Sequence, residues 1–146
     1  MAGEIAFERQ LLRDGILDEA RLAKARQDAA SRGVALPEAL VQAGVATADA
    51  VYRSLADFCE MRFVSPSKME IPVDVVSKVP ARFATHYNFV PVQERNGTIV
   101  VAVSDPLNHQ LLDDIRLVLK KHRVEIVVAT PYEISRAKKS IHDVLA

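Results

Sequence analysis

Residues of the kinds that usually do chemistry are few in this chain and lie far apart. Successive histidines, at His86, His109, His122 and His142, are 23, 13 and 20 residues apart. None therefore has a second histidine one helical turn away, and a metal site, which needs three or four ligands close together, is not expected. Cys59 is the single cysteine, so an internal disulfide and a thiolate cluster are excluded, and a buried structural thiol is the favoured role.

The acidic residues and the glycines give no catalytic arrangement either. Asp113 and Asp114 are adjacent, but neighbours on a helix point about 100° apart and cannot easily share a proton or an ion. Asp105, before Pro106, is placed to end a strand and begin a turn, although the same position often carries functional groups in open α/β sheets. The glycines form no phosphate-binding loop of the G-x-G-x-x-G or G-x-x-x-x-G-K-[ST] type. The sequence thus predicts no enzyme activity and no cofactor for this segment.

Charge is distributed unevenly along the chain, although the formal net charge is zero. Residues 1–60 hold 7 Lys and Arg against 10 Asp and Glu, whereas residues 61–146 hold 12 against 9. The late positive charge is either a solvated surface or a docking patch, for an acidic partner or for the acidic first half. The zero net charge and the absence of tryptophan argue against nucleic-acid binding. The candidate partner-binding patch consists of Arg116, Lys120, Lys121 and Arg123.

A sequence repeat organises the first part of the chain. Residues 11–18 align with residues 40–47 at an offset of 29 positions. Each copy is predicted to be a helix, a glycine turn, an apolar pair and a capped second helix. Glycine can adopt the left-handed backbone that ends a helix, and Asp or Thr can cap the next helix. One such unit cannot bury its apolar face alone, so the two copies are expected to pack on each other. The repeated scaffold positions are Leu11, Gly15, Ile16, Leu17, Leu40, Gly44 and Val45.

The repeat predicts a helical subdomain over residues 1–61. Residues 62–80 follow as a proline-bounded linker with a short helix or two, because three prolines interrupt any long element. Periodicity and capping residues place the four helices of the subdomain at about 4–13, 18–32, 37–43 and 47–60.

Residues 81–146 are predicted to form a small mixed α/β subdomain. A short helix over 81–87 leads into a β-hairpin, because Asn96-Gly97 is a strong turn signal between two apolar runs. The strand over 98–103 lacks polar alternation and should be covered on both faces. A helix to about residue 121, a strand over 124–129 and a closing amphipathic helix complete a β-α-β unit with two parallel strands. The fold class is therefore α+β.

The order of these features resembles a known domain. The duplicated Leu-x-x-x-Gly-apolar-apolar unit and the proline-bounded linker precede residues 99–107, Ile-Val-Val-Ala-Val-Ser-Asp-Pro-Leu, with Asp-Asp-Ile-Arg at 113–116. Nearly the whole chain resembles the N-terminal domain of type II secretion and type IV pilus assembly ATPases. The resemblance implies a non-catalytic domain that precedes a hexameric motor and docks it onto inner-membrane platform proteins.

Some members of that family bind cyclic di-GMP through two copies of the motif Arg-Leu-Gly-x-x-Leu-x-x-x-Gly-apolar-apolar-x-x-x-x-Leu-x-x-x-Leu-x-x-Gln. This chain keeps the apolar and glycine scaffold of the motif but lacks its polar contacts. Glu8 has the wrong charge for a phosphate and Pro37 has no backbone N–H, so cyclic di-GMP binding is not expected. The Arg-Leu-Gly positions are occupied by Ala6-Phe7-Glu8 and Ala35-Leu36-Pro37, and the closing Gln positions by Ala29 and Phe58.

We therefore expect a docking and regulatory domain that binds the cytoplasmic domain of a platform protein, with an ATPase motor downstream. Two alternatives remain open: a cyclic di-GMP receptor with a site rebuilt around Arg9, Arg13 or Arg32, and an interaction protein that works without a motor. No targeting segment opens the chain and no apolar run approaches the length of a membrane span. The expected location is cytoplasmic, at the inner membrane through partners.

Overall fold

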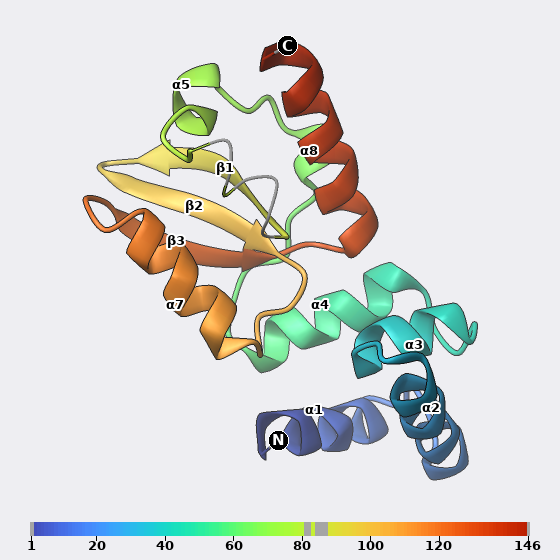
Figure 1. Ribbon diagram of the computed structural model, residues 1–146. Helices are drawn as coiled ribbons and strands as arrows, with labels where there is room; N and C mark the ends of the chain where they lie inside the picture. The colour runs from blue at the N-terminus through green and yellow to red at the C-terminus, as the bar shows by residue number, and fades with distance from the viewer. Residues whose placement is uncertain (1, 81–82, 84–87, 146) are drawn as a thin grey trace. The chain divides into compact units, whose positions relative to one another are not determined.

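The computed structural model describes residues 2–80, 83 and 88–145 (Figure 1). The chain divides into two units, Met1–Glu60 and Met61–Ala146. The first unit is helical and the second combines helices with a sheet, so the α+β prediction is confirmed. The helices described in the first unit are α1 (Ala2–Arg13), α2 (Glu19–Arg32), α3 (Leu36–Gln42) and α4 (Ala48–Phe58).

The two copies of the repeat end their first helices in the same way. Gly15 and Gly44 adopt left-handed backbone, with φ of 71° and 72°. In each turn the residue after the glycine donates its N–H to the carbonyl oxygen five residues earlier, a pattern that satisfies the last free carbonyls of a helix. These bonds run from Ile16 to Leu11 at 3.1 Å and from Val45 to Leu40 at 3.2 Å.

The second helix of each copy begins with a side-chain cap. Asp18 accepts a hydrogen bond from the backbone N–H of Arg21 at 2.8 Å, and Thr47 accepts one from Ala50 at 3.1 Å. Such caps satisfy backbone donors that the first turn of a helix leaves without partners. The glycine turn and the cap together fix where one helix stops and the next begins.

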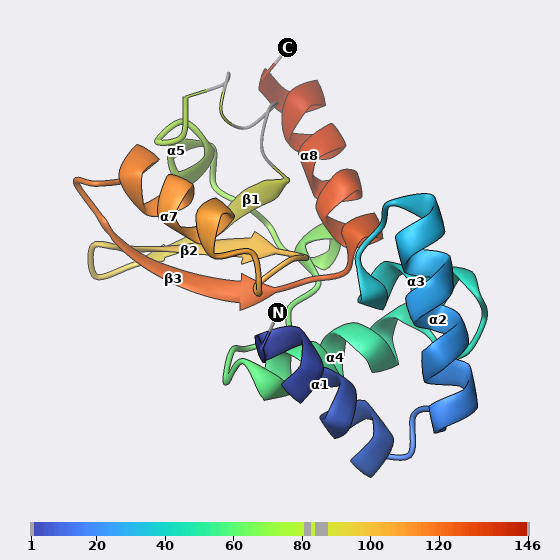
Figure 2. The same cartoon turned by 60° about the horizontal axis from the view of Figure 1, so that its bottom comes forward.

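The sheet of the second unit has the order β1-β2-β3 within the described residues, with β2 (Thr98–Val103) in the middle. β1 (Phe89–Arg95) pairs with β2 in antiparallel fashion around the Asn96-Gly97 turn. β2 and β3 (Arg123–Val128) are parallel and are connected through α7 (His109–Val118), as Figure 2 shows. The predicted hairpin and β-α-β unit are thus both present.

Helices cover both faces of the sheet. Ile99, Val101 and Val103 of β2 pack in one apolar cluster with residues of α7. The alternate residues of β2, Val100 and Ala102, pack in a second cluster with residues of α8 (Pro131–Leu145). Burial of both faces explains why this strand has no polar alternation in its sequence.

The segment predicted as a linker, residues 62–80, is part of the second unit. It contains η1 (Pro66–Lys68) and α5 (Val73–Val76), as the prolines indicate. Phe63 makes a parallel bridge with Val128, which extends the sheet beyond β3. The unit boundary therefore lies between residues 60 and 61, because these backbone bonds tie the segment to the strand. The helix predicted over 81–87 falls mostly outside the described residues.

Candidate interaction sites

The scaffold positions of the repeat are structural in this chain. Leu11, Leu17 and Leu40 are buried, and Ile16 and Val45 are half-buried behind the two glycine turns. Apolar side chains in these places join the helices of the first unit and present no polar group to a ligand. Any polar contact of the first unit with a ligand would need side chains outside this scaffold.

An ion pair between a buried carboxylate and an exposed arginine connects α1 and α2. The Glu8 side chain is only 7% exposed, whereas the Arg26 side chain is 55% exposed. Arg26 donates through Nε to Glu8 Oε1 at 3.1 Å and through Nη2 to the second carboxylate oxygen, so the pair is bidentate. The hydrogen bond from Arg26 to Glu8 and the charge of this carboxylate raise the pKa of the guanidinium. Glu8, which stands at the Gly position of the motif, is thereby committed to an internal contact.

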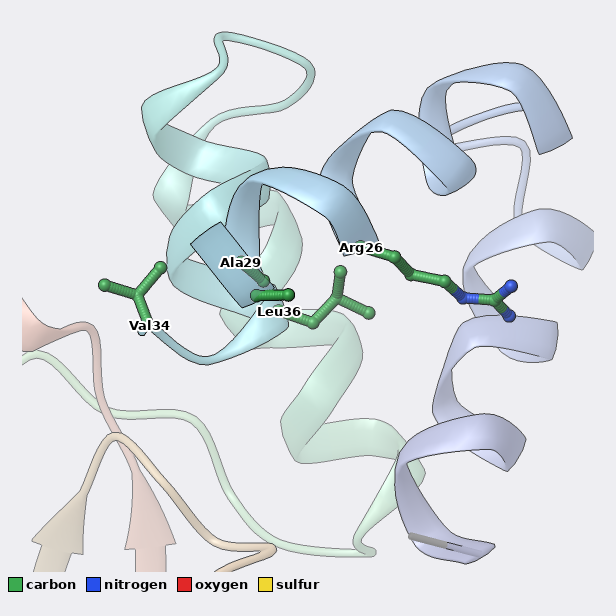
Figure 3. A pocket seen from close by; sticks show the side chains of 5 residues that line it. Arg26, Ala29, Val34 and Leu36 are labelled. Carbon is green, nitrogen blue, oxygen red and sulfur yellow. The ribbon is translucent and has the colours of Figure 1, made fainter. Parts of the chain in front are cut away.

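A shallow depression of about 250 Å³ lies beside this ion pair, between the end of α2 and the start of α3 (Figure 3). Two of the residues that line it, Ala29 and Leu36, occupy the closing Gln position of the first motif copy and the Leu position of the second. Arg26 supplies the single charged group of the lining, and its guanidinium extends away from Leu36 toward α1. Apart from Arg26, the side chains of the depression are apolar, so its polar contacts can come only from Arg26 and from backbone atoms.

The predicted basic patch lies where α7 ends and β3 begins. Lys120 and Lys121 are exposed in the connecting turn, and Arg123 is exposed as the first residue of β3. Arg116 belongs to the last turn of α7 and approaches Asp113 at 3.9 Å, with both side chains more than half exposed. Such an exposed pair contributes little to stability, but it offsets part of the charge of Arg116.

The sheet register adds a further cation that the sequence pattern did not indicate. Arg95 pairs with Thr98, and Thr98 pairs with Arg123, so the two arginines lie on either side of one residue. Strands are about 4.8 Å apart, which places the two Cα atoms about 10 Å from each other. In Figures 1 and 2 the β1–β2 turn and the α7–β3 turn project at the same end of the sheet. We call Arg95, Lys120, Lys121 and Arg123 the basic end.

The basic end carries uncompensated charge. Across residues 2–80, 83 and 88–145, none of its four side chains makes an ion pair. The carboxylates nearest in the sheet are already engaged, because Glu94 pairs with Lys78 and Glu125 pairs with Arg62. The sequence of the α7–β3 turn indicates three of these cations, and the pairing of the three strands places Arg95 near Arg123.

Other residues singled out by the sequence have plain structural surroundings. Cys59 is half-buried rather than buried, and this burial raises the pKa of its thiol. Desolvation by the surrounding protein also raises the pKa of the Asp105 carboxyl, against the hydrogen bond from Asn108, although the residue as a whole is exposed. The Asn108 side chain also caps α7. Within the described part of the chain, no group of three or more His, Cys, Asp or Glu could hold a metal ion, and His86 lies outside it. No described helix combines the length and the apolar character that a membrane crossing needs.

The fold is shared with MshE and with the N-terminal domain of XpsE. A structure of MshE with cyclic di-GMP matches 92% of this chain and 97% of its own, with a TM-score of 0.83 and 20% identity. The N-terminal domain of XpsE covers 94% of each chain, with a TM-score of 0.74 and 22% identity. At these identities the likeness establishes the fold.

The family follows from the sequence match. The MshEN domain model matches residues 59–141, more than half of the chain, and the chain belongs to this family. MshEN is an N-terminal, non-catalytic domain of ATPases, which confirms the predicted resemblance. The matched range contains the strand, Asp-Pro turn and helix that carried the resemblance, whereas the helical repeat lies outside it.

Two curated relatives place this domain within longer proteins. The type IV pilus assembly ATPase PilB of Myxococcus xanthus is 28% identical over 132 residues, which are 87% of this chain and 22% of that protein. PilB of Pseudomonas aeruginosa is 26% identical over 115 residues, which are 75% of this chain and 19% of that protein. The chain thus spans about a fifth of the curated relatives it matches.

Proposed function

We propose that this chain is a docking domain of a secretion or pilus-assembly ATPase that binds the cytoplasmic domain of an inner-membrane platform protein. The basic end is the observation that carries the proposal. Four exposed cations gather at one end of a rigid sheet, and none has a carboxylate partner among the described residues. Such a surface attracts an acidic partner and orients it as it approaches.

Charge reversal tests this docking surface. We expect Lys120→Glu, Lys121→Glu and Arg123→Glu together to weaken binding of the platform protein's cytoplasmic domain by at least tenfold at 0.1 M salt. The loss should shrink at 0.5 M salt, because the Debye length falls to a few ångströms. Lys68→Glu, Arg136→Glu and Lys139→Glu change the same charge at other exposed positions of this unit and serve as the matched control. Equal effects of the two triple variants would remove the basic end from the proposal.

The motor belongs to the proposal as well, because the relatives are ATPases about five times as long as the matched segment. A G-x-x-x-x-G-K-[ST] segment encoded downstream in the same gene would support a domain that serves its own motor. The absence of such a segment would favour an independent interaction protein. In either case the domain would act on the cytoplasmic side, at the inner membrane through its partner.

A second candidate function is reception of cyclic di-GMP, favoured by the fold shared with MshE, whose structure contains this ligand. The residues of this chain argue against cyclic di-GMP binding. Glu8 and Pro37 stand where the motif requires glycine, and the depression beside them is lined mainly by apolar side chains. Of the arginines that could rebuild a site, Arg32 already donates to Gln42 at 2.9 Å.

A further inference from the structure

Two arginines and a threonine form a row across the three strands of the sheet. Arg95 of β1 pairs with Thr98 of β2, and Thr98 pairs with Arg123 of β3. Residues that pair across strands share a face of the sheet, so the three side chains project on one side. Thr98 alternates along β2 with Val100 and Ala102, which pack in the cluster that contains residues of α8. The row, which we call the arginine row, therefore lies on the face of the sheet opposite α7.

The arginine row is open to solvent, although the rest of this face is covered. Arg95 and Arg123 are exposed and Thr98 is half-buried. The next residue of β2 on the same face, Val100, is only 1% exposed. The row therefore marks the place where the packed part of this face ends and the accessible part begins.

The two arginines have no counter-ion among the described residues. They are separated by one strand, which places their Cα atoms about 10 Å apart, and neither makes an ion pair there. Glu125 is the next residue of β3 on this face, but Arg62 already holds its carboxylate at 2.9 Å. Glu94 is adjacent to Arg95 along β1 and therefore projects from the other face. An anion that approaches the row would meet two uncompensated guanidinium groups.

The residue types of the row match one kind of anion. A guanidinium presents a planar fork of N–H donors that fits the two oxygens of a carboxylate. Two such forks, with a threonine hydroxyl between them, supply donors from both sides and from below. Strand pairing fixes this spacing, whereas Lys120 and Lys121 carry point charges on flexible side chains in the turn after α7.

We propose that the arginine row is the specific contact of the docking surface, and that it binds the carboxylate of one aspartate or glutamate side chain of the partner protein. This inference rests on the proposed function and specifies the group that the partner presents. Lys120 and Lys121 attract the partner through long-range charge. The arginine row provides the directional hydrogen bonds that fix the partner's position.

Substitution of arginine by lysine separates hydrogen-bond geometry from charge. Arg95→Lys with Arg123→Lys keeps the net charge of the whole chain but removes both planar forks. Calorimetry should show binding of the platform protein's cytoplasmic domain weakened about tenfold, the effect of losing roughly one charge-assisted hydrogen bond. Arg9→Lys with Arg13→Lys makes the same change at exposed positions of α1 and should leave binding unchanged.

A peptide tests the arginine row without the platform protein. A hexaglutamate peptide should shift the NMR signal of the Thr98 backbone amide and the side-chain Nε–H signals of Arg95 and Arg123. The shift at Thr98 should be lost when both arginines of the row are replaced by lysine. Thr98→Val removes the hydroxyl but keeps a β-branched side chain, and it should weaken peptide binding severalfold.

The outcomes separate this inference from the proposed function. If charge reversal at the basic end weakens platform binding but the lysine variant of the row does not, docking stands and the carboxylate contact is wrong. If the platform domain does not bind at all, the proposed function fails, and the peptide shifts still decide whether the row binds carboxylates. Inorganic phosphate that shifts Thr98 at a lower concentration than the peptide would assign the row to phosphate groups and overturn the inference.

Discussion

At the residue scale, the Glu8–Arg26 ion pair is asymmetric, because one partner is buried and the other is half-exposed. Arg26→Ala leaves a buried carboxylate without its donor, which is costly in a low-dielectric environment. Glu8→Gln leaves a guanidinium that water can solvate. We therefore expect Arg26→Ala to lower the free energy of unfolding at least twice as much as Glu8→Gln, measured by urea denaturation.

Two further variants make this comparison specific. The double variant Glu8→Ala with Arg26→Ala should recover part of the loss seen in Arg26→Ala, because the unpaired carboxylate is removed. Arg21→Ala breaks an exposed contact with Asp18 at 3.9 Å and should be nearly neutral. Equal losses for the two single variants of the Glu8–Arg26 pair would show that the burial of Glu8 does not matter.

Asp105 gives a small pH dependence whose sign follows from desolvation of its carboxylate, although the residue is exposed. Its pKa is raised in the folded chain, so the folded state holds the proton more tightly than the unfolded state. Below the pKa of Asp105 in the unfolded chain, the side chain is protonated in both states and does not destabilise the fold. As the pH rises through the higher pKa of the folded state, the side chain becomes charged and stability is lost. Asp105→Asn should raise the melting temperature at pH 7 more than at pH 3. Glu70→Gln, at another exposed acidic position, is the control and should not show this difference.

At the element scale, the two glycine turns make equivalent demands on the backbone. A Cβ at Gly15 or Gly44 would meet no atom within 4 Å, so substitution costs only the strain of positive φ. We expect Gly15→Ala and Gly44→Ala each to destabilise by about 1–2 kcal/mol, measured by chemical denaturation. Asn tolerates the left-handed region better, so Gly15→Asn and Gly44→Asn should cost less. A loss confined to one turn would contradict the equivalence of the repeats.

The same elements show what sequence reasoning could reach. Helix ends were predicted within a few residues because local signals determine them, such as Thr47 as a cap and Gly44 as a stop. The bridge from Phe63 to Val128 could not be predicted, since residues 65 positions apart form it. Arg95 was missed for the same reason, because its position beside Arg123 depends on two strand pairings. Local sequence signals therefore predict where helices and strands begin and end. The residues that come together in the candidate site depend on how the strands pair, which those signals do not determine.

At the scale of the whole molecule, the chain keeps the fold of a domain that in MshE holds cyclic di-GMP, while its own motif positions lack polar contacts. We expect no heat of binding when cyclic di-GMP is titrated into the whole chain at micromolar concentrations. Several charge-assisted hydrogen bonds, each contributing about 1.5–3 kcal/mol, have no donors at the motif positions of this chain. The loss of even two of them would weaken binding by roughly a factor of 100 or more.

The MshE N-terminal domain provides the positive control for this titration, because its structure contains the ligand. Low-micromolar affinity in this chain would contradict the prediction and point to a rebuilt site in the first unit. Arg9→Ala, Arg13→Ala and Arg32→Ala would then locate it, while charge reversal at the basic end should leave that affinity unchanged. If no heat is observed and charge reversal at the basic end weakens platform binding, protein docking is the function that the chain retains. The two titrations together therefore decide between a receptor and a docking domain.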